Sequence, residues 1–103
     1  MKTVLMALAV AVAVLPLAAG AQHASGPNDF MTTMDKMHKS MPKPTGDIDR
    51  DFAAMMIVHH QGAIDMAQIE LQHGKNAALK KMAKKMISDQ TAEIKQLQKH
   101  VAK

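Results

Sequence analysis

Residues 49–67, DRDFAAMMIVHHQGAIDMA, decide the fold of this chain. The stretch contains no proline, and its apolar side chains recur at the three- and four-residue spacing of a helix. Asp47 precedes it with a side chain that caps a helix N-terminus. The pattern continues to His73, where Gly74 is typical of the residue that follows a helix. We therefore predict one long helix that begins after Asp47 and ends at His73.

A second long helix is predicted from about Asn76 to about Val101. A loop of only two or three residues separates it from the first helix, so the two must form an antiparallel hairpin. No stretch of the chain alternates polar and apolar residues as a strand does. The apolar positions of this helix, interrupted by Gln90, are Leu79, Met82, Ala83, Met86, Ile87, Ile94, Leu97 and Val101.

A shorter, methionine-rich helix is predicted ahead of the hairpin. Asn28 or Asp29 can cap it, and it runs to about Ser40. The stretch 41–46 contains two prolines and a glycine, which cannot continue a helix, and is read as a linker. Residues 22–46 thus form a mobile polar lead, a short helix and a linker, and residues 47–103 form the hairpin domain.

The first residues have the pattern of a secretory signal peptide. Lys2 is followed by an apolar run, Val4 to Leu17, and then by small residues at 18–21. The run is shorter than the ~20 residues that span a bilayer, which makes an uncleaved anchor the less favoured alternative. We expect residues 1–21 to be removed and the protein to be periplasmic or secreted. Cleavage after Gly20 instead would create an Ala-Gln-His terminus that suits Cu(II).

The predicted fold class is all-α, with the hairpin joined by the short N-terminal helix. Two helices of this length leave one apolar face open to solvent. Either the short helix folds over that face, or a second copy covers it. We expect a helical bundle that is completed by dimerisation.

The composition points to a soft metal. The chain has no cysteine but eleven methionines and six histidines. Thioethers are poor ligands for Zn²⁺, Mg²⁺ or Ca²⁺ and suit Cu(I), whereas imidazole accepts both Cu(I) and Cu(II). Helical spacing and the hairpin register predict two clusters on the inward side. The first comprises Met55, Met56, His59 and His60, and the second comprises Met66, His73, Met82 and Met86.

Two plainer interpretations compete with a metal site. Methionine often fills irregular cores, and an inward histidine is often only a hydrogen-bonded core residue. The net charge of +4 could suggest nucleic acid, but export argues against that partner. Lys80, Lys81, Lys84 and Lys85 are expected to form a solvated helix face. After removal of the signal peptide we expect no membrane partner.

The long helix resembles a known family, on a run of residues that is specific. An aspartate is followed by phenylalanine, a Met-Met pair, a His-His pair and the sequence G-A-I-D-M-A. These are Asp49, Phe52, Met55, Met56, His59, His60 and residues 62–67, followed by a weaker block of Ile87, Gln90, Glu93 and Ile94. From Asp49 to about Val101 the chain is similar to the family of domain of unknown function 305, which includes CopM-type copper-resistance proteins.

This resemblance implies a ferritin-like architecture, export, copper binding and copper tolerance. It places Met55, Met56, His59, His60 and Met66 in the site region. The chain departs from the family pattern at Val58, where proline is common, and at Leu97, where methionine is common. The short methionine-rich helix lies outside the resemblance.

The preferred interpretation is therefore an exported copper chaperone, buffer or sequestering protein that is not an enzyme. It would hold Cu(I), with Cu(II) possible, and could exchange it with a copper-transfer protein. The first alternative is a di-iron carboxylate protein, because residues 70–73 read Glu-x-x-His and Glu93 could supply another carboxylate. The second alternative is a helical interaction module without a metal.

Overall fold

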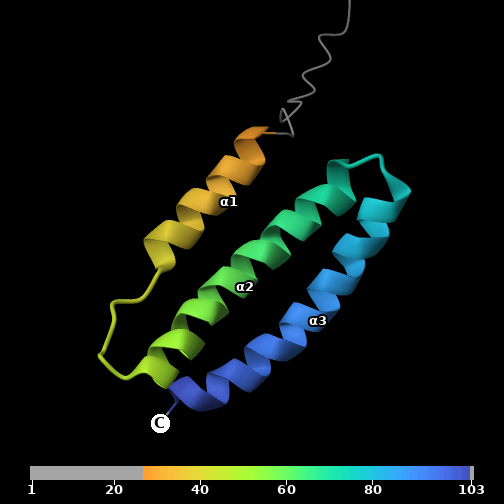
Figure 1. Cartoon of the computed structure of the whole chain (residues 1–103). Coiled ribbons are helices and arrows are strands. Elements are labelled where there is room, and N and C mark those ends of the chain that lie inside the picture. The colour runs from red at the N-terminus through yellow and green to blue at the C-terminus, as the bar shows by residue number, and fades with distance from the viewer. Residues whose placement is uncertain (1–26, 103) are drawn as a thin grey trace, which may run out of the picture.

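The structure is a computed structural model that describes residues 27–102. It contains three helices, α1 (Pro27–Ser40), α2 (Ile48–His73) and α3 (Ala77–Val101), and no strand within the described residues (Figure 1). The all-α prediction is confirmed. The predicted signal peptide, residues 1–21, and the polar lead up to residue 26 lie outside the described residues.

Both long helices begin at side-chain caps. The Asp47 carboxylate accepts a hydrogen bond from the backbone N–H of Arg50 at 3.1 Å, and Asn76 accepts one from the N–H of Leu79 at 3.0 Å. Such caps satisfy N–H groups that have no partner inside the helix. The loop from Gly74 to Asn76 is too short for any connection but a tight reversal, and α2 and α3 run antiparallel as predicted.

One local expectation was wrong. The first helix begins at Pro27, so Asn28 and Asp29 lie inside it rather than at its cap. Proline suits a first helical turn because its missing N–H would have no partner there. Gly74 follows α2 as expected, but its φ of −68° is not left-handed. Glycine is needed because a Cβ at this position would lie 2.6 Å from the carbonyl oxygen of Glu70.

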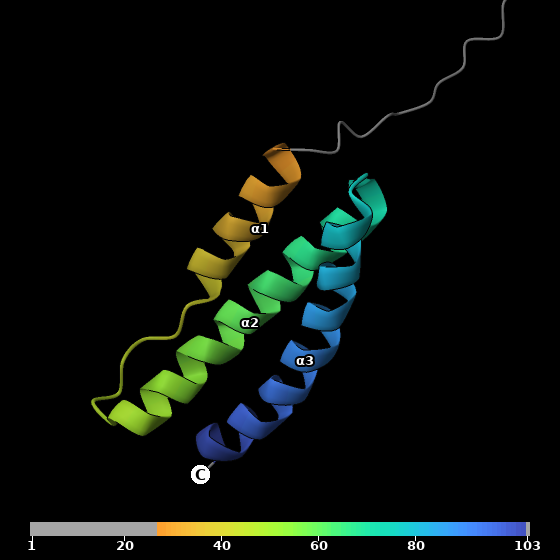
Figure 2. The ribbon, with the colours of Figure 1, turned by 45° about the vertical axis from the view of Figure 1, so that its right-hand side comes forward.

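The helices form an open layer with α2 in the middle. Figures 1 and 2 show α1 on one side of α2 and α3 on the other. The two outer helices pack on α2 and not on each other. Nothing in the described range 27–102 is both long and apolar enough to cross a membrane. Since α1 does not bridge to α3, α2 stays partly uncovered on both faces of the layer.

Small side chains make up most of the core. Its buried apolar residues are Ala53, Ala63, Ile64, Ala67 and Ala83, and no large side chain in the described part of the chain is fully buried. The helix α1 approaches α2 at Gly62, where an added Cβ would lie 2.9 Å from the Met37 sulfur. A glycine in mid-helix costs about 1 kcal/mol relative to alanine, and here it admits a neighbouring helix.

The linker between α1 and α2 is held by one carboxylate. Gly46 has a φ of +94°, which few other residues adopt readily. This turn directs the backbone N–H groups of Thr45 and Gly46, and the Thr45 hydroxyl, to the Asp51 carboxylate at 2.7–3.0 Å. These hydrogen bonds, with those of Thr45 the largest cause, lower the pKa of Asp51 below its ordinary value of 3.8.

This clamp predicts a pH-dependent contribution to stability. Because the pKa of Asp51 is lowered on folding, its contribution is complete above pH ~4 and is lost as the pH falls through the folded pKa. Asp51→Asn should unfold more easily at neutral pH, and its stability should fall less steeply below pH ~4. Urea unfolding followed by circular dichroism tests this. Parallel pH profiles for the two proteins would contradict the clamp.

Candidate metal centre

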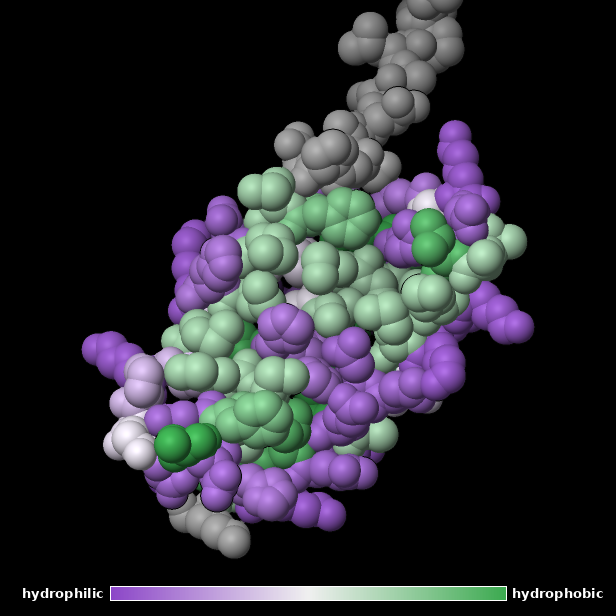
Figure 3. Space-filling model, in the orientation of Figure 1, coloured by the Kyte–Doolittle hydropathy of each residue, from purple (hydrophilic) through white to green (hydrophobic). Residues whose placement is uncertain are grey.

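The methionines lie around the core rather than in it. All nine in residues 27–102 are half-buried or exposed, and none is among the buried apolar residues. A methionine that only filled the core would be enclosed like the alanines. In Figure 3, one face of the layer shows two apolar areas separated by hydrophilic side chains. Two pockets on this face contain methionines.

The pocket nearer the α2–α3 turn is lined by three methionines. Met66 from α2 and Met82 and Met86 from α3 surround a space of about 230 Å³, and Phe30 from α1 closes one side. Met82 is 58% exposed and Met86 is 36% exposed. Glu70 and Leu79 are also on the wall. Three thioethers from two helices therefore border one accessible, mostly apolar space, which we call the methionine pocket.

The pocket nearer the other end of the hairpin combines nitrogen, oxygen and sulfur groups. His60 and Met56 from α2 line it together with Glu93 and Leu97 from α3, around about 390 Å³. The His60 Nε2 lies 2.5 Å from a Glu93 carboxylate oxygen. We call this the histidine pocket. It offers harder donors than the methionine pocket does.

The two adjacent histidines have different surroundings. His60 is buried, at 9% exposure, and its Nδ1 has no hydrogen-bond partner among the described residues. His59 is exposed, with a ring centroid 6.4 Å from that of His60 and a ring plane tilted by 59°. Because successive side chains diverge by about 100° around a helix, only His60 is directed into the histidine pocket.

The predicted clusters are thus assembled in part. Met66, Met82 and Met86 meet, but His73 is exposed at the end of α2 and does not line their pocket. Met56 and His60 meet, whereas Met55 and His59 lie outside the histidine pocket. Across residues 27–102, no three histidine and carboxylate side chains converge into a metal-binding group.

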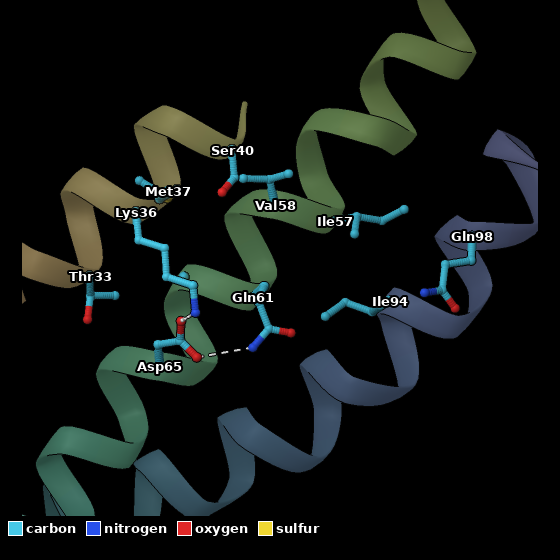
Figure 4. Close-up of a pocket in the computed structure, with 11 residues that line it drawn as sticks. Thr33, Lys36, Met37, Ser40, Ile57, Val58, Gln61, Asp65, Ile94 and Gln98 are labelled. Carbon is cyan, nitrogen blue, oxygen red and sulfur yellow. Dashed lines mark hydrogen bonds and ion pairs between the residues drawn. The ribbon is translucent and has the colours of Figure 1, made fainter. Parts of the chain in front are cut away.

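The opposite face of the layer has different chemistry. A pocket of about 230 Å³ lies there between α1, α2 and α3, with Met37 as its only sulfur (Figure 4). In the figure, Lys36 reaches from α1 to Asp65 of α2, a contact of 3.4 Å, and Gln61 donates to the same carboxylate at 3.1 Å. Of these two contacts, only the Lys36–Asp65 pair joins α1 to α2. This pocket has no group of soft donors.

Several residues that line these pockets were not predicted as site residues. Glu93 was considered only as an iron ligand, although it is the partner of His60, and Phe30 was not considered at all. The hairpin register could have identified Glu93, because it places His60 within about a turn of it. Nothing local to Phe30 indicates its place, which depends on how α1 packs.

Loss of the Glu93 carboxylate should destabilise the fold through His60. Glu93→Ala leaves a buried imidazole with neither nitrogen paired, which should lower the free energy of unfolding by about 1–3 kcal/mol. The double variant His60→Leu, Glu93→Ala removes the buried polar group and should recover most of this loss. Asp89→Ala, one turn away in an exposed ion pair, is the control and should cost little. Equal losses in Glu93→Ala and Asp89→Ala would contradict the role of His60.

Comparison with known proteins identifies the family of the chain. Neither a curated protein nor a solved structure shows significant similarity to the chain. The sequence matches the family described as "Domain of unknown function (DUF305)" over residues 5–101. This match is wider than the stretch from Asp49 that carries the resemblance, and it includes α1. The chain therefore belongs to the DUF305 family.

Proposed function

We propose that this protein binds copper outside the cytoplasm as a chaperone, buffer or sequestering protein. The observation that carries the proposal is the methionine pocket, where Met66, Met82 and Met86 border one accessible space. Neutral, polarisable thioethers are suited to Cu(I), and the chain has no thiolate that would compete for it. Copper is the cargo here, and no catalysis is proposed.

The position of these methionines argues against a packing role alone. Met82 is more than half exposed, so it contributes little to the core, while alanines and Ile64 fill the space between the helices. Exposed methionine on a small protein loses the hydrophobic stabilisation that burial would provide. A ligand that must capture and release an ion needs this accessibility. Exchange with a copper-transfer protein would therefore involve the monomer, in which Met82 is exposed.

The histidine pocket is the second candidate for copper. It offers the imidazole of His60 and the thioether of Met56, together with the Glu93 carboxylate. Nitrogen and oxygen donors are suited to Cu(II), so we assign that oxidation state to this pocket. His100 of α3 also lines this pocket and is a second imidazole that a bound ion could recruit, and His59 is exposed beside it.

A di-iron centre is less well supported. Such centres gather several carboxylates and histidines around two ions. In this protein Glu70 lines the methionine pocket and Glu93 lines the histidine pocket, so they lie in separate spaces. The donor set of each pocket instead favours a single soft or borderline ion. Export rests on the apolar N-terminal segment and is part of the same proposal.

We also propose that two copies pair through the face that carries both pockets. The described part of one copy has no fully buried large side chain, while Phe52 is 59% exposed and Leu79 is 50% exposed. Chains of this size need a larger core or a partner to be stable. A second copy stacked on this face would bury these side chains and complete a bundle.

Replacing the three pocket methionines should remove Cu(I) binding without unfolding the protein. Met66→Leu, Met82→Leu and Met86→Leu together keep the side-chain volume, so each should cost less than about 1.5 kcal/mol. We expect the Cu(I) affinity to fall by roughly 100-fold or more, since even outer-shell changes cost 10–100-fold. A titration against a Cu(I)-specific chelator measures it, with mass spectrometry to count the ions.

The matched control changes three methionines of the N-terminal part, Met31→Leu, Met34→Leu and Met41→Leu, and should leave this affinity nearly unchanged. An equal loss in both triple variants would contradict the methionine pocket as the site. A separate variant, His59→Ala with His60→Ala, should weaken Cu(II) binding. Unchanged copper binding in that folded variant would contradict the histidine assignment.

The pairing of two copies predicts a specific sensitivity to charge. Phe52→Lys places a charge on the face with the pockets, and we expect it to shift the protein from dimer to monomer in sedimentation experiments. Gln68→Lys adds the same charge at an exposed site on the other side of α2 and should leave the dimer intact. A wild-type protein that is monomeric at all concentrations would exclude the dimer.

A further inference from the structure

Six of the 13 lysine and arginine residues of the chain lie on α3. Five of its lysines are exposed and the sixth is half-buried. Successive side chains turn by about 100°, so five of the six fall on the half of α3 that faces away from α2, and the half-buried Lys80 lies at the inner border of this set, about 60° from the buried Ala83. Figure 3 shows hydrophilic side chains along this edge of the layer. The lysine face, as we call this set, comprises Lys80, Lys81, Lys84, Lys85, Lys95 and Lys99.

Few acidic side chains lie near this face. The two carboxylates of α3 are Asp89, which pairs with Lys85, and Glu93, which points to His60. Most of the other acidic residues lie on α2 and its N-cap. Apart from Lys85, no lysine of the face forms an ion pair with any residue in 27–102. An ordinary solvated helix face mixes both signs of charge.

We propose that the lysine face docks on an anionic lipid bilayer. From Lys80 to Lys99 the row extends about 28 Å at 1.5 Å per residue along a straight helix, which suits a broad flat surface. None of the pockets described above is lined by these lysines, so the face has no described pocket that could bind a single small anion. Clusters of four to eight basic residues on an amphipathic helix are typical of anionic membrane recognition.

The side-chain types favour lipid over an acidic protein. The face has lysine alone, with no arginine and no aromatic residue anywhere on α3. Protein interfaces are enriched in arginine, tyrosine and tryptophan and depleted of lysine, and phosphate recognition at a defined site favours the arginine fork. Lysines attract a diffuse negative surface without a defined geometry. This proposal replaces the expectation of no membrane partner, which considered only apolar anchors.

The lysine face is also free to act independently of copper. Figure 2 shows α3 at the edge of the layer. None of these lysines lines either pocket, so a second copy stacked on the pocket-bearing face would leave them exposed. In a dimer, each copy would contribute one such row. Membrane docking therefore does not rest on the proposed copper function.

Vesicle binding tests the proposal. Protein from expression of the full sequence is sedimented with phosphatidylcholine vesicles, with or without about 30 mol% phosphatidylglycerol. We expect binding only to the anionic vesicles, and its loss when salt rises from about 0.05 M to about 0.5 M. Lys81→Gln, Lys95→Gln and Lys99→Gln together should weaken it by roughly 100-fold, since each lysine contributes about fivefold.

The control removes the same charge elsewhere. Lys39→Gln, Lys43→Gln and Lys75→Gln together alter exposed lysines outside α3 and should reduce binding far less. Circular dichroism confirms that both variants remain helical. Equal weakening in both variants would reduce the effect to net charge and overturn the proposal. So would equal binding to both vesicle types, or binding to soluble polyglutamate in preference to anionic vesicles.

Discussion

The close approach of three helices through small side chains is the constraint on which the rest of the structure depends. Alanines at 53, 63, 67 and 83 form most of the core, and Gly62 admits Met37 of α1. Helices that pack this closely leave no room between them for long side chains. The methionines and phenylalanines are therefore displaced to the edges of the contacts, where they line pockets instead of filling a core. The donor atoms are accessible because the core is narrow.

The same packing places two different sets of possible metal ligands at opposite ends of α2. The end near the turn gathers three sulfur atoms, and the other end sets an imidazole against a carboxylate. The spacing follows from the hairpin, because the loop at 74–76 fixes which residues of α2 and α3 lie level with each other. The buried His60 remains in place because Glu93 satisfies one of its nitrogens. An imidazole buried without any partner would be costly.

Acidic and basic side chains are also unevenly distributed between α2 and α3. The acidic residues of α2 cap its N-terminus, bind the linker through Asp51 and hold α1 through Asp65. The lysines of α3 face outward and have few partners within the described residues. One hairpin thus has a soft-donor face and a basic edge, which can act at the same time because they point in different directions.

The sequence by itself determined the number of helices, their order and the tight hairpin, since these depend on local periodicity and on side chains such as the Asp47 cap of α2. It also indicated that Met66, Met82 and Met86 would meet, because the short loop sets their register. Only the tertiary structure decided which of the adjacent histidines is buried, that Glu93 pairs with His60 and that Phe30 closes the methionine pocket. These contacts depend on the rotation of each helix about its own axis and on the docking of α1. Both are set by packing between elements distant in sequence, which no local pattern specifies.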